Sequence, residues 1–420
     1  MNYYKKIKKC RVCDCESLDT VFKIEKQYLS PTFVKTNEGN LLSKVKVPQT
    51  LVLCGDCKLL QLKETVDPDL LYKEYFYRTA INDTMKIDLK DLVESCLEEV
   101  KPSENDTILD IGANDGTMLS FYPNTLRRVG VDPAENIDWT NVEESITIVN
   151  DYFSKKCLEG VLKEDKVKII TSCAMFYDID KPNKFVQDIK EILHEDGMWC
   201  IQLSYLPLML SNMNFYDICN EHLEYYSLHT LQYLMNKNGL SIFHAEENAV
   251  NGGSVKVFIS HTEKNSTLTE SFKSLYAKEE ELELDKPETY VSFEERANYI
   301  KKAIGDYIKT EKDTGSLVIG LGASTKGNML LQFFEIGKET IPFISERNPQ
   351  KVGLRTMGTD IELISEEAAR KLNPSCMLVL PWYFKDEIVK REREYLDRGG
   401  KLLMPMPYPH VITKDGETNV

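Results

Sequence analysis

The sequence has no apolar run of transmembrane length, and its first residues, Met1-Asn-Tyr-Tyr-Lys-Lys6, lack the apolar core of a signal peptide. Positive charge is also scarce, because 52 Lys and Arg stand against 67 Asp and Glu and give a formal net charge of −15. This surplus of acid disfavours nucleic acids and anionic membranes as partners, although a local basic pocket can still hold an anionic small molecule. We therefore expect a cytoplasmic protein with no nucleic-acid or membrane partner.

The composition is that of a globular protein with two or three domains. The chain has 420 residues, of which 42% are apolar, and this length exceeds what one hydrophobic core usually serves. Its polar composition suits a monomer. The eleven cysteines of a cytoplasmic protein indicate metal ligands and buried thiols and not disulfides.

Two paired cysteine motifs near the N-terminus predict a metal site. Cys10-x-x-Cys13 and Cys54-x-x-Cys57 each present two sulfurs, and together they can surround one tetrahedral ion such as zinc. The segment between the pairs must itself be folded, and we expect short strands around residues 21–24 and 51–53. Four cysteine ligands leave no open position on the metal, so a structural zinc is predicted. The alternative is four unrelated buried cysteines.

The segment Thr107-Ile-Leu-Asp-Ile-Gly-Ala-Asn-Asp-Gly-Thr117, with Gly130-Val-Asp132 one strand later, predicts a cofactor site. An apolar strand that enters a glycine-rich turn lets the backbone approach a ligand before a helix begins. The carboxylates of this region disfavour a pyrophosphate, but they suit the cationic groups and ribose hydroxyls of S-adenosylmethionine. The alternative is an ordinary turn between a strand and a helix. The predicted cofactor-binding residues are Asp110, Gly112, Asn114, Gly116, Asp132 and Phe153.

Strands alternate with helices around this turn, which predicts an α/β fold. A helical pattern over 88–100 precedes the turn, and strands are predicted at 107–111, 128–132, 146–149, 167–172, 198–203, 240–244 and 254–260. Helices separate the first five strands and the last two lie close together. This arrangement fits the mixed sheet of class I methyltransferases, a Rossmann-like fold.

A polar and aromatic segment, Tyr216 to Ser227, lies between the fifth and sixth predicted strands. It contains His222 beside Glu221, and it follows the carboxyl end of a strand, where open α/β sheets bind ligands. We therefore expect chemistry at His222, whereas His229 is expected to lie on the surface or to pack within the next helix. The alternative for His222 is a structural imidazole paired with Glu221 or Glu224.

A second glycine turn predicts another nucleotide-binding fold in the last third of the chain. Leu317-Val-Ile-Gly-Leu-Gly-Ala-Ser-Thr-Lys-Gly-Asn328 follows a helix expected near 294–310, and strands at 340–346, 376–380 and 401–405 with a helix over 385–398 complete the unit. Thr325 stands where the dinucleotide fingerprint has its third glycine, which weakens an NAD site. A lysine, hydroxyls and free amides at a helix start suit phosphate oxygens instead. The alternative is a structural turn. The candidate contacts are Gly322, Ser324, Thr325, Lys326, Glu346 and Arg347.

These motifs, in this order, carry a resemblance that covers nearly the whole chain. The chain resembles the sugar C-methyltransferases that act on nucleotide-linked keto-deoxysugars. The resemblance implies a zinc-bearing N-terminal domain, a central S-adenosylmethionine domain, and a Rossmann-like C-terminal domain that helps to hold the nucleotide sugar. The matching segments are the two cysteine pairs, Tyr77 to Met85, the Asp110 to Gly116 turn, Glu221 to Ser227, Asn251 to Ser254, Gly320 to Gly327 and Leu380 to Trp382. The expected division is 1–85, 86–265, a helical connection over 266–300, and 301–420.

The resemblance also implies the reaction, a methyl transfer to the sugar carbon next to a ketone. His222 is then the base that removes a proton from this carbon, Glu221 orients His222 or stabilises charge, and Tyr77 steadies the enolate oxygen. Family members that methylate carbon 3 have a histidine where this chain has Asp178 and a tyrosine where it has Cys219. We expect both positions to line the sugar site, with Tyr177, Tyr225 and Tyr226 as compensating residues.

Three other functions stay open. An O- or N-methyltransferase on a related nucleotide-linked sugar would use the same cofactor and needs no ketone. An oxidoreductase with NAD at the second glycine turn is disfavoured by Thr325 and Lys326. A nucleotide-sugar binding protein without catalysis would need no base at His222.

Overall fold

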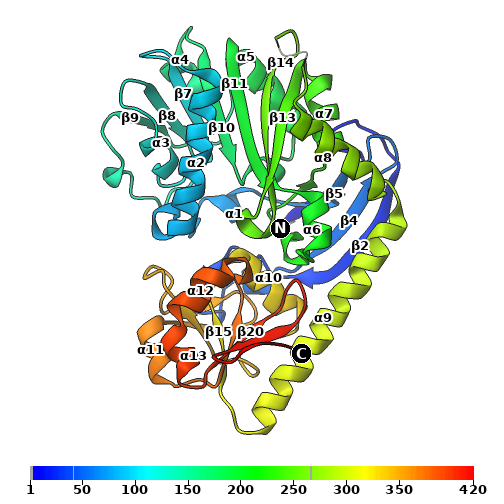
Figure 1. Ribbon diagram of the computed structural model, residues 1–420, viewed down its shortest axis with the longest axis vertical. Coiled ribbons are helices and arrows are strands. Elements are labelled where there is room, and N and C mark those ends of the chain that lie inside the picture. Colours follow the sequence, from blue (N-terminus) through cyan, green and yellow to red (C-terminus); the bar gives the residue numbers. More distant parts are fainter. Residues whose placement is uncertain (1–2, 41, 265–266) are drawn as a thin grey trace.

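The computed structural model describes residues 3–40, 42–264 and 267–420. Two α/β units lie one above the other, and a sheet from the N-terminal part of the chain runs along their side (Figure 1). A long helix, α9 (Pro287–Asp313), leads from the central unit down the flank of the C-terminal unit. Within the described residues, no helix is long and apolar enough to cross a membrane.

A four-stranded antiparallel sheet, in the order β12-β5-β4-β2, combines three strands of the N-terminal part with β12 (Glu224–Tyr225). All eight residues of the central strand β4 are buried, because this strand is covered on both faces. Among the smaller strands, β1 and β6 pair with each other, and β3 joins the C-terminal sheet. The bounds are β1 (Tyr4–Lys6), β2 (Leu18–Gln27), β3 (Phe33–Val34), η1 (Leu42–Lys44), β4 (Val47–Cys54), β5 (Leu60–Leu62), β6 (Glu64–Val66), α1 (Asp69–Tyr72) and η2 (Thr79–Ile81).

The central unit is a seven-stranded sheet in the order β13-β14-β11-β10-β7-β8-β9, in which only β14 runs antiparallel to its neighbours. This mixed sheet confirms the predicted class I methyltransferase fold. The strands are β7 (Thr107–Ile111), β8 (Arg127–Val131), β9 (Ile146–Val149), β10 (Val167–Cys173), β11 (Leu193–Ser204), β13 (Leu240–Asn248) and β14 (Ser254–His261). The helices are α2 (Asp83–Val100), α3 (Thr117–Ser120), α4 (Glu159–Leu162), α5 (Pro182–Ile192), α6 (Leu206–Ser211), α7 (Leu228–Lys237) and α8 (Glu270–Glu281), with short η3 (Trp139–Asn141), η4 (Lys156–Leu158), η5 (Phe176–Asp178), η6 (Phe215–Asp217) and η7 (Val250–Gly252).

The C-terminal unit is a nine-stranded sheet in the order β22-β21-β20-β19-β15-β16-β18-β17-β3. Its middle strands are parallel, which confirms a second Rossmann-like unit. The strands are β15 (Val318–Leu321), β16 (Phe343–Glu346), β17 (Arg355–Thr356), β18 (Glu362–Ser365), β19 (Cys376–Val379), β20 (Lys401–Met404), β21 (His410–Thr413) and β22 (Gly416–Asn419). The helices are α10 (Thr325–Phe333), α11 (Glu366–Lys371), α12 (Lys385–Arg391) and α13 (Arg393–Asp397), with η8 (Trp382–Phe384).

Strands that leave one unit and join another hold the three sheets together. β3, from the N-terminal part, pairs with β17 at the edge of the C-terminal sheet. β12 (Glu224–Tyr225), which follows His222, pairs with β5 of the N-terminal sheet. The buried face of α9 packs on β2, where the rings of Phe22 and Phe293 have centroids 5.7 Å apart. The site between the units is therefore built on a continuous framework.

Candidate functional site

The four predicted metal ligands converge on one point. The sulfurs of Cys10, Cys13, Cys54 and Cys57 lie within 4.8 Å of one another. Cys10 Sγ is 3.5 Å from Cys57 Sγ, and Cys13 Sγ is 3.4 Å from Cys54 Sγ, close to the spacing of about 3.8 Å that a tetrahedral zinc with Zn–S bonds of about 2.3 Å requires.

Hydrogen-bond donors around the sulfurs suit thiolates. The Val12 amide and the Gln61 side chain donate to Cys10 Sγ, and the Asp56 amide donates to Cys54 Sγ. The pKa of Cys10 is lowered to about 5, first by the Cys57 thiol that donates to it. The donor set therefore fits a closed, structural zinc site, as predicted.

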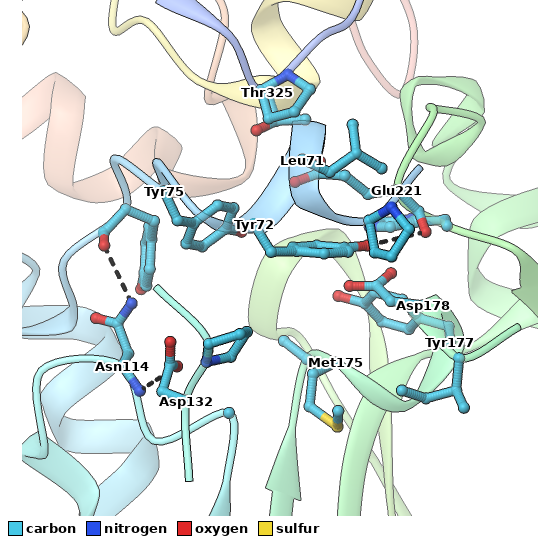
Figure 2. Close-up of a pocket in the computed structure, with 18 of the residues that line it drawn as sticks. Leu71, Tyr72, Tyr75, Asn114, Asp132, Met175, Tyr177, Asp178, Glu221 and Thr325 are labelled. Carbon is cyan, nitrogen blue, oxygen red and sulfur yellow. Dashed lines mark hydrogen bonds between the residues drawn. The ribbon is translucent and has the colours of Figure 1, made fainter. Parts of the chain in front are cut away.

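A cavity of about 870 Å³ lies where the three parts of the chain meet. Its walls include the glycine turn after β7, the segment around α1, the loop before β12 and the start of α10. Figure 2 shows the rings of Tyr72 and Tyr75 in the middle, with Asn114 and Asp132 on one side and Asp178 and Glu221 on the other. The cavity thus has two walls. The first carries residues predicted to bind the cofactor, such as Asn114 and Asp132, and the second carries titratable groups, such as Asp178 and Glu221.

The glycine turn has the shape that the sequence predicted. Gly112 has φ of 78°, and a Cβ on it would lie 3.0 Å from Met175 Cγ. Gly116, also at positive φ, caps the start of α3, and its Cβ would press on Val142. Gly112 lines the cavity and Gly116 does not, so Gly112 is the point where the backbone can approach a ligand.

Two buried carboxyls stand at the ends of neighbouring strands in this wall. Burial raises the pKa of Asp110 to about 7, although the Thr171 hydroxyl donates to it at 2.7 Å. Asp132 accepts from the amides of Asn114 and Ala134, each at 2.9 Å, and burial also raises its pKa. Both line the cavity, so they can hold cationic and hydroxyl groups of S-adenosylmethionine.

The segment that contains Tyr77 closes over the glycine turn. Asn114 Nδ2 donates to the carbonyl of Tyr77, and the amides of Thr79 and Ala80 donate to Asn114 and Asp115. Tyr77 lines the cavity with a residue exposure of 40%, and Phe153 lines it from the loop after β9. This segment therefore links the predicted cofactor turn to the opposite wall.

The second wall carries Glu221 and His222, from the loop that precedes β12. Glu221 is 4% exposed, His222 is 7% exposed, and both line the cavity. Burial raises the pKa of Glu221 to about 8, and one of its carboxyl oxygens has no hydrogen-bond partner in the described part of the chain. Burial, with the charge of Lys326, lowers the pKa of His222 well below its usual value. A neutral imidazole therefore stands next to a carboxyl in the cavity wall.

Aromatic and acidic residues surround this pair. The Tyr177 ring lies against the His222 ring, with centroids 4.1 Å apart. Asp178 lines the same cavity, and burial followed by the charge of Glu221 raises its pKa well above the usual range. Tyr225 lies behind the wall, where its hydroxyl donates to the carbonyls of Asp217 and His222. Cys219 is fully buried and does not line the cavity.

The C-terminal unit contributes only part of its predicted set. Ser324 and Thr325 line the cavity at the start of α10. Lys326 lines it too, but its ammonium lies 2.7 Å from Asp217 Oδ1. Burial alone would lower the pKa of Lys326, yet the pKa is raised because Asp217 favours the charged form.

The other predicted residues of this unit lie outside the cavity wall. Gly322 packs against Pro381, which a Cβ would approach to 2.7 Å. Glu346 accepts from the amides of Ala323 and Asn348, and Arg347 pairs with Glu387. Tyr72, Tyr75 and Lys351 also line the cavity, although they were not among the predicted site residues. The aromatic-rich segment Tyr72-Lys-Glu-Tyr-Phe-Tyr77 was a signal for the tyrosines, whereas no motif marked Lys351.

Comparison with known proteins identifies three consecutive family models in the chain. Residues 10–72 match a putative zinc binding domain, residues 82–245 a methyltransferase domain, and residues 249–407 a C-methyltransferase C-terminal domain. The C-methyltransferase NovU of Streptomyces niveus is 26% identical over 411 residues, which cover 97% of this chain and 98% of that protein.

Solved structures match the chain over less than half its length. A chain of the complex between the Haloferax volcanii Trm112 methyltransferase activator and a putative methyltransferase is 15% identical, with a TM-score of 0.35, over 43% of this chain and 94% of its own. An S-adenosylmethionine-dependent methyltransferase of Clostridium acetobutylicum ATCC 824 is 15% identical, with a TM-score of 0.33, over 43% of this chain and 93% of its own.

Proposed function

Because the chain belongs to the S-adenosylmethionine-dependent C-methyltransferases, with a structural zinc in its N-terminal part, we propose that its acceptor is a nucleotide-diphosphate-linked 4-keto-deoxysugar. The observation that carries the proposal is one cavity lined both by the Asp110 and Asp132 wall and by the Glu221 and His222 wall. A donor and an acceptor can meet there away from bulk water. We propose that residues 1–85 bind zinc, residues 86–265 bind the cofactor and residues 301–420 bind the nucleotide sugar. Residues 266–300 form a helical connection.

His222 is suited to remove a proton from a carbon next to a ketone. A base must be neutral before it acts, and the low pKa of the buried imidazole keeps it neutral at ordinary pH. The neighbouring Glu221, as a carboxylate, stabilises the imidazolium that forms. Proton removal leaves an enolate, whose carbon then takes the methyl group.

Charge on the enolate oxygen needs a hydrogen-bond donor. Burial of its phenol raises the pKa of Tyr77, so the hydroxyl stays protonated and can donate. Tyr77 also lines the cavity and is fixed to the glycine turn through its carbonyl. We therefore propose that the Tyr77 hydroxyl donates a hydrogen bond to the enolate oxygen. Bound S-adenosylmethionine supplies the electrophilic methyl group.

The test is a panel of nucleotide-linked 4-keto and 4-hydroxy sugars, incubated with the protein and S-adenosylmethionine in deuterated water and followed by mass spectrometry. The proposal requires methylation of keto sugars alone, with deuterium entering next to the ketone when the methyl donor is withheld. Methylation of a hydroxyl or amine without exchange would replace it with the O- or N-methyltransferase alternative. A binding protein without catalysis would methylate no member of the panel.

A further inference from the structure

Lys351 is a buried lysine in the wall of the cavity, with no ion-pair partner in the described part of the chain. It is 8% exposed and lines the cavity, and its ammonium donates to the carbonyl of Ala323 at 2.8 Å and lies 4.9 Å from the centre of the Phe33 ring. Among residues 3–40, 42–264 and 267–420, no carboxylate lies within ion-pair distance of it. Buried charges are normally paired or bind a ligand, so this ammonium needs an explanation.

The surroundings of Lys351 increase the need for an anion. Burial lowers the pKa of Lys351, and the charge of Arg78 acts in the same direction. Glu346 opposes this effect, but both of its carboxyl oxygens already accept backbone amides, from Ala323 and Asn348. The guanidinium of Arg78 donates to backbone carbonyls, including that of Asn136, and forms no ion pair among the described residues. The charges of Asp115 and Asp132 favour the charged form of Arg78. Lys351 is thus left, in a protein with net charge −15, as a cation with no free carboxylate beside it in the described part of the chain.

The position of Lys351 in the fold is that of a ligand site. It follows the carboxyl end of β16, next to the turn between β15 and α10, and these two parallel strands are neighbours. A turn fixes it there, in which Asn348 Oδ1 accepts from Gln350 and the Asn348 carbonyl accepts from the Lys351 amide. Open α/β sheets bind phosphates at such adjacent strand ends, where the first amides of a helix are free.

We propose that Lys351, together with the amides of Thr325 and Lys326 at the start of α10, binds the diphosphate of the acceptor; the next amide, of Gly327, already donates to the Ser324 hydroxyl. The inference rests on the proposed function, and it names the part of the site that holds the negative charge. Lys326, which the sequence favoured for this role, is already engaged by Asp217. Ala323, whose carbonyl accepts from Lys351, precedes Ser324 and Thr325 in the chain, and the Thr325 side chain lies within hydrogen-bond reach of Glu221. A diphosphate at Lys351 would therefore leave the sugar end toward Glu221 and His222.

The experiment measures binding of UDP, TDP, inorganic pyrophosphate and the two parent nucleosides by calorimetry, with wild type, Lys351→Met, Lys351→Arg and Lys338→Met. Lys338 is a matched control, because it belongs to the same unit but pairs with Asp360 at the surface. We expect Lys351→Met to lose about tenfold or more of the affinity for the best-bound diphosphate, because a hydrogen-bonded charge is removed. Lys351→Arg should keep most of this affinity, and the affinities for the two nucleosides should stay unchanged.

Folding is checked separately in the same variants. Lys351→Met replaces an unpaired buried charge by an apolar chain of similar length, so its melting temperature should not fall below that of wild type. Added diphosphate should raise the melting temperature of wild type and not that of Lys351→Met. Equal diphosphate binding by wild type and Lys351→Met, or no diphosphate binding by wild type, would overturn the inference. Lysine-dependent diphosphate binding without any methylation of keto sugars would instead remove the proposed function and keep this anion site.

Discussion

The imidazole of His222 lies against the ring of Tyr177, with centroids 4.1 Å apart and planes at 49°. The two residues come from different segments, which the Leu223 amide joins by donating to the Tyr177 carbonyl at 2.8 Å. This contact fixes the orientation of the candidate base at the cavity wall. Its position therefore depends on the pairing of two segments that are about 45 residues apart in the chain.

Replacing His222 should remove chemistry and leave cofactor binding intact. His222→Asn should reduce turnover by roughly 10²- to 10⁴-fold, the usual contribution of a positioned base. Calorimetry should find the affinity for S-adenosylmethionine unchanged, because His222 lies on the opposite wall. His229→Asn is the control, since this ring stacks on Tyr276 outside the cavity and does not line it. Normal turnover in His222→Asn would transfer the role of base to another group.

Glu221 should give the reaction a pH dependence. Its pKa of about 8 means that much of the free enzyme carries a protonated carboxyl at neutral pH. If the carboxylate stabilises the imidazolium of His222, kcat/KM should rise with pH and level off above about pH 8. Glu221→Gln should lower kcat/KM and abolish this rise. A kcat/KM that falls through the same range would instead mean that the protonated carboxyl is the active form.

Even a methyl side chain at position 112 should weaken the binding of S-adenosylmethionine. Gly112→Ala places a Cβ 3.0 Å from Met175 and holds alanine at φ of 78°, a conformation that costs about 1–2 kcal/mol. We expect the affinity for S-adenosylmethionine to fall by about tenfold or more, measured by calorimetry. Gly160→Ala is the control, because no atom lies near its Cβ position and its φ is not positive. Equal affinities in the two variants would locate the cofactor elsewhere.

The sequence predicted the features that depend on local pattern. Five of the seven strands of the central sheet agree with their predicted ranges within one residue, because each combines an apolar run with a nearby turn or helix. The four cysteine ligands followed from spacing alone. Two strands are longer than predicted. β11 begins at Leu193, which pairs with Val167 of β10 before the register shifts, and β13 continues along β14 to Asn248.

Features that depend on distant partners could not be predicted. β3 and β12 are two-residue strands, and each exists only because it pairs with a strand from another unit. The ion pair of Lys326 with Asp217 joins positions 109 apart in sequence, whereas the local motif predicted that this lysine contacts phosphate oxygens. Lys351 lies in a turn without a motif, so only its burial in the cavity wall draws attention to it.

Asp110 should make the protein without cofactor less stable as pH rises. Its pKa is about 7 in the folded protein and 3.8 in the reference state, so the folded state binds more protons between these values and loses stability as pH increases from about 4 to about 7. Asp110→Asn should remove this contribution, on the order of a few kcal/mol at pH 8. The melting temperature of Asp110→Asn relative to wild type should therefore be higher at pH 8 than at pH 4. A constant difference across this range would contradict the raised pKa.

The zinc site should control the folding of the N-terminal part and, through it, the position of His222. Cys54→Ser should lose bound zinc, measured by elemental analysis, and lower the melting temperature, because binding energy of a closed cysteine site is also folding energy. Cys15→Ser is the matched control, since Cys15 lies near the cluster but its sulfur is not among the four that converge. It should keep zinc and stability. Because β5 pairs with β12 just after His222, loss of zinc should also displace His222 and reduce turnover more than the affinity for S-adenosylmethionine. Full turnover in a zinc-free protein would separate the metal site from the position of His222.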